Sequence, residues 1–256
     1  MKVVVLAGGY GTRLAEETEL KPKPMVEIGG YPVLWHILKH YAYYQHQEFL
    51  IALGYRGVDI KRYFLERASL SGDLTIRLAS QELERHKADL DDWTVQLIET
   101  GTETNTGGRV KRLERLLEGG TFMLTYGDAV SDVDVSSLLT FHKTCGRVGT
   151  VTAVRPPARF GGLIFNGDLV AKFTEKPQIG EGWINGGYLV FEPEIFRYLS
   201  NDDCSLEADV LEKMARDKQL AAYRHEGFWQ CMDTLRDKRL LESMWRSGKA
   251  PWKIWE

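Results

Sequence analysis

The chain alternates between short apolar runs and longer amphipathic segments over its first 155 residues. Apolar runs that are typical of buried strands occupy 2–7, 49–54, 121–128 and 149–154. Helical spacing of apolar residues is found between them, in 32–46 (with Pro32 at the first helical position), 57–68, 108–118 and about 134–144. Two further strands, 75–80 and 95–100, flank the charged segment 82–93. This alternation predicts a mostly parallel sheet with helices on both faces.

The pattern changes after residue 155. Asn166 and Gly167 stand between two strand-like runs, which is a strong hairpin signal. A glycine-containing strand follows at 183–191. Two more helices are expected, at about 205–218 and 234–247. We expect a single domain over 1–256 in which the later part adds a small β-hairpin annex to the same sheet.

Composition and charge exclude several classes of protein. The 256 residues are 43% hydrophobic, which is enough to bury the core of one large α/β domain. The net charge of -3 gives no basic footprint for nucleic acid. No apolar run approaches the roughly 18 residues of a membrane helix, and 3–7 is too short for a signal peptide. We therefore expect a cytoplasmic protein with neither nucleic acid nor membrane as a partner.

The cysteines and histidines do not indicate a disulfide framework or a zinc site. Cys145, Cys204 and Cys231 are far apart, odd in number and without a CxxC pair. His36 and His40 are four residues apart on a predicted helix and could form a metal pair. Since no third ligand is nearby in the sequence, we favour a polar or half-buried helix face.

A glycine-rich turn, 8–11, follows the first strand and exposes backbone N–H groups, as phosphate-binding loops do. It is not a P-loop, and it lacks the third glycine of a dinucleotide-binding fingerprint, which argues against an NAD-dependent oxidoreductase. The prolines of 21–24 also prevent a helix there. The segment therefore reads as an extended loop that presents Arg13, Lys21 and Lys23. A glycine turn with solvated charges remains the alternative.

Two segments, "LAGGYGTRL" (6–14) and "KPKPMVEIGGYPVL" (21–34), resemble the signature of the sugar-1-phosphate nucleotidyltransferases. The likeness covers essentially the whole chain and is strongest to the cytidylyltransferases of that family. It is carried further by the segments at 106–112, 124–135, 173–177, 184–191, 227–238 and 248–253. The resemblance implies a Rossmann-like, mixed and mostly parallel sheet of the nucleotide-diphospho-sugar transferase type. The nucleotide-binding half would be 1–155, and the sugar-binding half with the C-terminal helices would be 156–256.

The resemblance also implies a reaction. A cytidylyl group would pass from CTP to a sugar 1-phosphate, with α-D-glucose 1-phosphate the first choice, and pyrophosphate would leave. The attacking phosphate has a second pKa near 6 and is already mostly dianionic, so a general base is unnecessary. The protein would instead orient two polyanions and neutralise charge, with Mg²⁺ as cofactor. The family likeness further implies a homo-oligomer, specifically a hexamer.

Roles for individual residues follow from the same resemblance. The catalytic residues would be Arg13, Lys23, Asp128 and Asp233, with Asp128 and Asp233 as the Mg²⁺ ligands. The nucleotide-binding residues would be Leu6, Ala7, Gly8, Gly9, Gly11, Thr12, Thr104, Thr106, Arg109 and Gly127. The sugar-phosphate-binding residues would be Glu175, Lys176, Asn185 and Gly186. Lys21 is expected to be structural or peripheral.

Several of these residues also have a purely structural interpretation. Asp128 would be a turn residue, and Asp233 would cap the helix that follows Thr234. Arg109 would be a solvated residue at a helix start, although a cation is slightly unfavourable there. The segment 175–177 would be an exposed strand end.

The seven tryptophans are expected to pack rather than to bind a ligand, and Trp229 is one of them. Three of them, Trp245, Trp252 and Trp255, lie in the last twelve residues. This apolar tail should dock on the body of the protein or on a neighbouring subunit.

The sequence departs from the family pattern in a few places. Cys231 stands where the family motif W-Q-P-M-D-T has proline, which should loosen the backbone before Asp233. The segments 82–93, 160–165 and 205–214 also differ. Another acceptor or base is therefore an open alternative. A catalytically silent nucleotide-sugar sensor is disfavoured, because it should have lost one of the charged catalytic residues, all of which are present.

Overall fold

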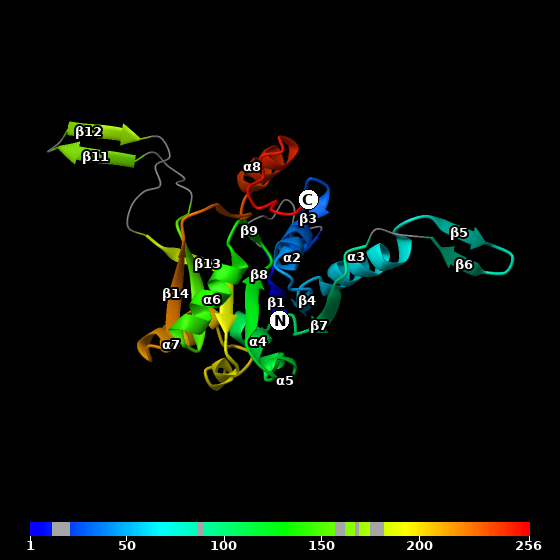
Figure 1. Cartoon of the computed structure of the whole chain (residues 1–256), viewed down its shortest axis with the longest axis horizontal. Coiled ribbons are helices and arrows are strands. Elements are labelled where there is room, and N and C mark those ends of the chain that lie inside the picture. The colour runs from blue at the N-terminus through cyan, green and yellow to red at the C-terminus, as the bar shows by residue number, and fades with distance from the viewer. Residues whose placement is uncertain (12–20, 87–89, 157–161, 167–168, 175–181) are drawn as a thin grey trace.

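The central feature of the fold is a seven-stranded sheet (Figure 1). The computed structural model describes residues 1–11, 21–86, 90–156, 162–166, 169–174 and 182–256. In spatial order the strands are β14 (Leu220–His225), β10 (Gly149–Val154), β13 (Ile184–Phe191), β8 (Phe122–Tyr126), β1 (Lys2–Ala7), β4 (Glu48–Leu53) and β7 (Thr94–Glu99). Only β13 runs antiparallel to its neighbours β8 and β10 within this sheet, and the other pairs are parallel. The predicted mixed, mostly parallel sheet is confirmed.

Each face of this sheet carries its own hydrophobic core. Along β1, Val3 and Val5 enter one core while Val4 and Leu6 enter the other, because successive strand residues point to opposite faces. The first core receives buried side chains from α2 (Val33–Tyr43), α3 (Gly57–Leu70), α6 (Val135–Cys145) and α8 (Leu235–Arg246). The second receives them from α4 (Thr106–Arg112), α5 (Glu114–Leu117), the 3₁₀ turn η3 (Pro193–Arg197), the π-helical turn η4 (Leu206–Leu211) and α7 (Glu212–Arg216). Helices therefore cover both faces, as predicted.

Four short two-stranded elements complete the described fold. Hairpins β5–β6 (Leu74–Arg77 and Glu82–Arg85) and β11–β12 (Gly162–Asn166 and Leu169–Thr174) lie away from the main sheet at opposite sides of Figure 1. The strands expected around Asn166 are thus confirmed, whereas Gly167 lies outside the described residues. The other two pairs are β2–β3 (Glu27–Ile28 and Tyr31–Pro32) and β9–β15 (Ala129–Ser131 and Trp229–Cys231).

Some predicted boundaries were wrong. Pro32 precedes the first residue of α2, because its ψ of 145° is extended and not helical. The helix expected over 108–118 begins at Thr106 and breaks at Leu113, whose φ of -93° and ψ of 0° end α4 and start α5. Part of the charged segment 82–93 forms β6, where Glu84 pairs across the hairpin with Arg77. Strand β14 was missed altogether.

The two helical histidines are fully buried, not half-buried as expected. His36 and His40 expose 0% and 2% of their surface. The Nε2 atom of His36 lies 2.9 Å from the carbonyl oxygen of Ile28, and that of His40 lies 2.9 Å from that of Val133. Burial lowers the pKa of both imidazoles to about 4. They have separate structural partners, so the metal-pair alternative loses its support.

The C-terminal tail docks on the body of its own chain. The indole of Trp245 packs edge-on against the His36 ring, with 4.7 Å between the centroids. Trp252 is 1% exposed, and its Nε1 atom lies 3.4 Å from Nδ1 of His36. The tail therefore closes the first core over α2, as the tryptophan content predicted. Over the residues that the structure describes, no helix is long and apolar enough to cross a lipid bilayer.

Candidate functional site

A pocket of about 720 Å³ opens at the carboxyl ends of β1 and β8. This is the edge at which open α/β sheets bind ligands. It brings together these residues singled out from the sequence: Leu6, Ala7, Gly8, Gly9, Gly11, Lys23, Thr104, Thr106, Arg109, Gly127, Asp128 and Asp233. Thr12, Arg13, Glu175 and Lys176 lie outside the described residues. Asn185 and Gly186 lie beside the pocket wall and do not line it.

Sequence reasoning missed several residues that line the same pocket. They are Tyr10, Pro24, Thr102, Glu103, Asn105, Tyr126 and Asp203. Tyr10, Pro24 and Tyr126 lie inside the family segments named above and were passed over there. Thr102, Glu103 and Asn105 lie just before the segment 106–112, so a wider motif boundary would have included them. Asp203 carries no such signal, because it reaches the pocket through tertiary packing of the segment before η4 against the start of α4, where the Asn105 amide donates to its carbonyl oxygen at 3.2 Å.

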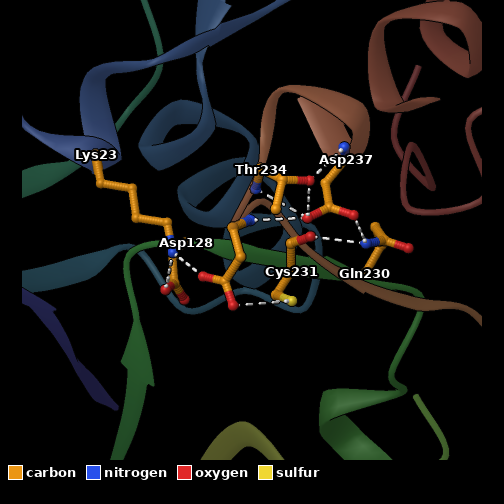
Figure 2. A network of polar contacts seen from close by, with 7 residues as sticks. Lys23, Asp128, Gln230, Cys231, Thr234 and Asp237 are labelled. Carbon is orange, nitrogen blue, oxygen red and sulfur yellow. Dashed lines mark hydrogen bonds and ion pairs between the residues drawn. The ribbon is translucent and has the colours of Figure 1, made fainter. Parts of the chain in front are cut away.

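Lys23, Asp128 and Asp233 all line the pocket and form an ion cluster. Figure 2 shows the Lys23 side chain extended toward Asp128. The Nζ atom of Lys23 lies 2.7 Å from Oδ2 of Asp128 and 2.5 Å from Oδ1 of Asp233. Lys23 opens the 3₁₀ turn η2 (Lys23–Met25), directly after Pro22, whose ψ of 150° is extended. The proline-spaced lysine thus points its ammonium group at two carboxylates that are 105 and 210 positions away in the sequence.

The β9–β15 pair is what brings the two aspartates together. Asp128 directly precedes β9, and Asp233 follows β15 by two residues. Cys231 pairs with Ala129, and the backbone N–H of Met232 donates to the Asp128 carbonyl oxygen at 2.9 Å. Cys231 thus takes part in this ladder despite replacing the proline of the family pattern.

Burial and charge act in opposite directions on Lys23, which is 9% exposed. Burial works to lower the pKa of its ammonium group, but the Asp128 and Asp233 carboxylates outweigh that and raise the pKa above its ordinary value. The thiol of Cys231 lies 3.7 Å from Oδ2 of Asp233. Burial, followed by the nearby carboxylates, raises the pKa of this thiol to about 11. The cluster is therefore an electronegative site that favours cations.

Asp233 does not have the capping role that its position allowed. The N-cap of α8 is Thr234, whose hydroxyl accepts from the backbone N–H of Asp237 at 3.2 Å. The Asp237 carboxylate accepts in return from the N–H of Thr234 at 2.9 Å, which completes a capping box. The carboxylate of Asp233 instead forms an ion pair with Lys23. Asp128 does lie in a turn, and its side chain also points to Lys23 (Figure 2).

Arg109 is buried, so its interpretation as a solvated residue was wrong. Its guanidinium donates to the carbonyl oxygens of Gly8 at 3.1 Å, Leu53 at 3.0 Å and Gly101 at 2.7 Å. These carbonyls belong to the carboxyl ends of β1, β4 and β7, which are neighbours in the sheet. Burial lowers the pKa of Arg109. The side chain therefore ties three strand ends together where it lines the pocket, and its contact with a ligand stays a prediction.

A polar network links the two halves of the chain at the pocket wall. The Glu207 carboxylate accepts from the Tyr126 hydroxyl and, at 2.7 Å, from the Thr106 hydroxyl. The Asn185 amide donates to the Tyr126 hydroxyl at 3.4 Å. Trp229 donates from Nε1 to the carbonyl oxygen of Gly186 at 2.7 Å. Thr106 and Asn185, assigned from the sequence to different ligands, are thus joined through Tyr126.

The cluster suits a metal ion that takes only part of its coordination from protein. Within the described ranges, no group of three or more His, Cys, Asp or Glu side chains is arranged to hold a metal. Asp128 and Asp233 nevertheless both approach one cation, the Lys23 ammonium. Mg²⁺ commonly uses one or two carboxylates and completes its shell with phosphate and water. The donor set therefore fits Mg²⁺ in the presence of a phosphorylated ligand.

Sequence comparisons show which known proteins this chain resembles. The sequence model of the family described as Nucleotidyl transferase matches residues 2–242. The chain is 46% identical over 257 residues to the glucose-1-phosphate cytidylyltransferase of Salmonella typhimurium, covering 100% of both chains. It is 32% identical over 250 residues to the mannose-1-phosphate guanylyltransferase catalytic subunit beta of Dictyostelium discoideum, covering 95% of this chain and 64% of that one.

Solved structures agree with the fold. HddC from Yersinia pseudotuberculosis, complexed with GMP-PN, superposes with a TM-score of 0.71 at 22% identity, over 95% of this chain and 99% of that one. A UDP-glucose pyrophosphorylase complexed with UDP-glucose superposes with a TM-score of 0.66 at 18% identity, over 96% and 98%. At these identities the likeness shows the fold alone, and it confirms the predicted fold class.

Proposed function

The chain belongs to the nucleotidyl transferase family, and we propose that it transfers a cytidylyl group from CTP to α-D-glucose 1-phosphate, giving CDP-glucose and pyrophosphate. The observation that carries this proposal is the convergence of Lys23, Asp128 and Asp233 in the pocket that the glycine-rich turn also lines. The full-length likeness to the Salmonella enzyme supports the choice of substrates.

The pocket offers the groups that this transfer needs. A phosphate oxygen of the sugar 1-phosphate would attack the α-phosphorus of CTP in line, and pyrophosphate would leave. The attacking oxygen is already ionised at neutral pH, so the protein has to orient and neutralise, without removing a proton. Backbone N–H groups of 8–11 would approach the nucleotide. Lys23 would hold the phosphates between which the new bond forms.

We propose Mg²⁺ as the cofactor, held by Asp128 and Asp233. When bound, it would neutralise part of the phosphate charge. Arg13 would contact the triphosphate, and Glu175 and Lys176 would contact the sugar and its phosphate; these three roles rest on the family pattern alone. The Asn185 amide donates to the hydroxyl of Tyr126, which lines the pocket. This contact supports a place for the sugar near Tyr126.

We further propose that the enzyme is a homo-oligomer, with a hexamer expected from the family likeness. Hairpin β5–β6 supports this, because a two-stranded hairpin is at best marginally stable alone. It and its surroundings also expose large apolar side chains, which a second copy of the chain would cover. These are Leu65, Leu70, Ile76, Leu78 and Leu83. Light scattering of the full chain tests the assembly directly.

The test of the activity is pyrophosphate release with Mg²⁺ over a grid of nucleoside triphosphates against sugar 1-phosphates. We expect a signal with CTP and glucose 1-phosphate that falls by about 10²-fold or more in Lys23→Ala and is unchanged in Lys21→Ala. Lys21 is a suitable control because it ends in a surface pair with Glu27 at 2.8 Å. A signal with CTP and another acceptor would indicate that the divergent segments 82–93, 160–165 and 205–214 determine a different sugar specificity. Silence with retained nucleotide-sugar binding would favour a sensor.

A further inference from the structure

The ammonium group of Lys23 stands where a divalent cation would have to bind. It contacts a carboxylate oxygen of each proposed metal ligand, Asp128 and Asp233, at 2.7 and 2.5 Å. We propose that Lys23 is a tethered, displaceable cation: it holds the two aspartates together in the nucleotide-free protein, and a divalent metal ion releases it toward the phosphates. This inference rests on the proposed function for the identity of the metal and of the phosphates.

Charge balance favours the exchange when no nucleotide is bound. The side chains of Lys23, Asp128 and Asp233 are 11%, 33% and 14% exposed, so water screens the cluster only in part. These three side chains alone, two carboxylates and one ammonium, sum to a charge of -1. Without the ammonium the two carboxylates would sum to -2, which disfavours a site that holds neither Lys23 nor a metal ion. A divalent ion added beside the ammonium would make the site positive, and the two cations would repel each other. A triphosphate in the same pocket supplies the negative charge that allows both cations to stay.

The structure provides a path for the released side chain. The backbone of Lys23 is held on both sides, because the Met25 N–H donates to the Pro22 carbonyl oxygen at 2.8 Å and the Val26 N–H donates to the Lys23 carbonyl oxygen at 3.1 Å. The side chain itself is a flexible four-carbon stem that lines the pocket together with Gly8, Gly9 and Gly11. Rotation about side-chain bonds is therefore sufficient to move the ammonium along the pocket.

The arrangement predicts an order of affinities. A metal ion alone must displace Lys23 without any compensation for its charge, so it should bind weakly to the nucleotide-free protein. The metal ion should bind more tightly when the nucleotide is present than when it is absent, and the nucleotide should bind more tightly when the metal ion is present. The alternative is that Lys23 permanently positions the two aspartates. In that case its removal should weaken metal binding, because the two carboxylates would no longer be held together.

Mn²⁺ binding to the nucleotide-free full chain separates the two cases. Water-proton relaxation would be titrated with Mn²⁺ alone for the wild-type protein, Lys23→Met and the matched control Lys21→Met. We expect Lys23→Met to bind Mn²⁺ at least tenfold more tightly than the wild type, and Lys21→Met to bind like the wild type. Equal or weaker binding in Lys23→Met would overturn the proposal.

A second measurement uses the wild-type chain and does not depend on how the variant folds. Reductive methylation followed by peptide mass spectrometry reports how accessible each lysine amine is. We expect Lys23 to be methylated slowly without metal and several-fold faster at saturating Mn²⁺, while Lys21 keeps its rate. An unchanged Lys23 rate would refute release. Neither experiment contains CTP or a sugar. The displacement of Lys23 can therefore be confirmed or refuted even if the protein shows no activity with any substrate pair.

Discussion

The guanidinium of Arg109 occupies the space that a side chain at Gly54 would need. A Cβ atom built on Gly54 would lie 2.4 Å from Nη1 of Arg109, and one built on Gly8 would lie 2.3 Å from the same atom. These glycines follow β1 and β4 directly. Glycine is therefore required at these two positions to leave room for the Arg109 side chain, independently of any contact with a ligand.

Substitution of Gly54 should disturb this clamp. We expect Gly54→Ala to lower the free energy of unfolding by about 2 kcal/mol, because the added methyl group overpacks a buried guanidinium and backbone. Urea unfolding measures it. Gly9→Ala is the matched control, since no heavy atom of the described chain beyond Gly9 and its two neighbours in sequence lies within 4 Å of its Cβ position. Similar losses in both variants would contradict this account of Gly54.

The fork of Arg109 should matter more than its charge. Arg109→Lys keeps the cation but cannot span carbonyls on three strands, so buried acceptors lose their donors. We expect a loss of about 3 kcal/mol in the free energy of unfolding, measured by chemical denaturation. Arg112→Lys is a suitable comparison, because that side chain pairs with Asp202 at the surface. A smaller loss at Arg109 than at Arg112 would sink the clamp interpretation.

Substitutions of Asp233 and Asp237 should affect different properties, turnover in the first case and the free energy of unfolding in the second. Asp237→Ala removes the partner in the capping box, and we expect it to cost about 1 kcal/mol of unfolding free energy with turnover largely retained. Asp233→Asn leaves the cap intact and leaves Lys23 paired with Asp128, so stability should change little. Its turnover should fall by about 10²-fold or more if it holds the metal ion. Thermal unfolding and pyrophosphate release, run in parallel on both variants, decide between them.

The buried histidines predict acid sensitivity. The pKa values of His36 and His40 fall from an ordinary 6.5 to about 4 because burial disfavours the charged form. Between these values the unfolded chain binds more protons than the folded one, so stability is complete above about pH 6.5 and decreases as the pH falls toward 4. The loss reaches about 3 kcal/mol for each histidine at the lower limit. Carboxylates and an imidazole act on these rings more weakly than burial does: Glu242 on His36, and Asp132, Asp134 and His225 on His40.

Urea unfolding at a series of pH values measures this dependence. His40→Gln should unfold with a shallower pH slope than the wild type over the same range, even if it is less stable at every pH. An unchanged slope would mean that other groups carry the acid sensitivity.

The local pattern of the sequence was enough for the layers of the fold, although it did not reveal strand β14. The unbroken apolar run of β1 required burial on both faces, and the alternation that follows it required helices on both sides of a mostly parallel sheet. The proline-spaced lysines, the hairpin strands around Asn166 and the apolar tail were also readable, because each depends on residues a few positions apart. The edges of elements, such as the break at Leu113, were less readable.

Only the tertiary structure decided which distant residues meet. Asp128 and Asp233 share Lys23 because β9 and β15 pair in one register, and nothing in the periodicity of either segment encodes that pairing. Arg109 is a buried clamp, and not the solvated residue of its structural alternative, because β1, β4 and β7 are neighbours in the sheet and their carboxyl ends present carbonyl oxygens to it. His36 became fully buried because the tail of the chain packs over it. Local propensity fixes the elements, whereas strand order and register fix the contacts between them, and those contacts form the site.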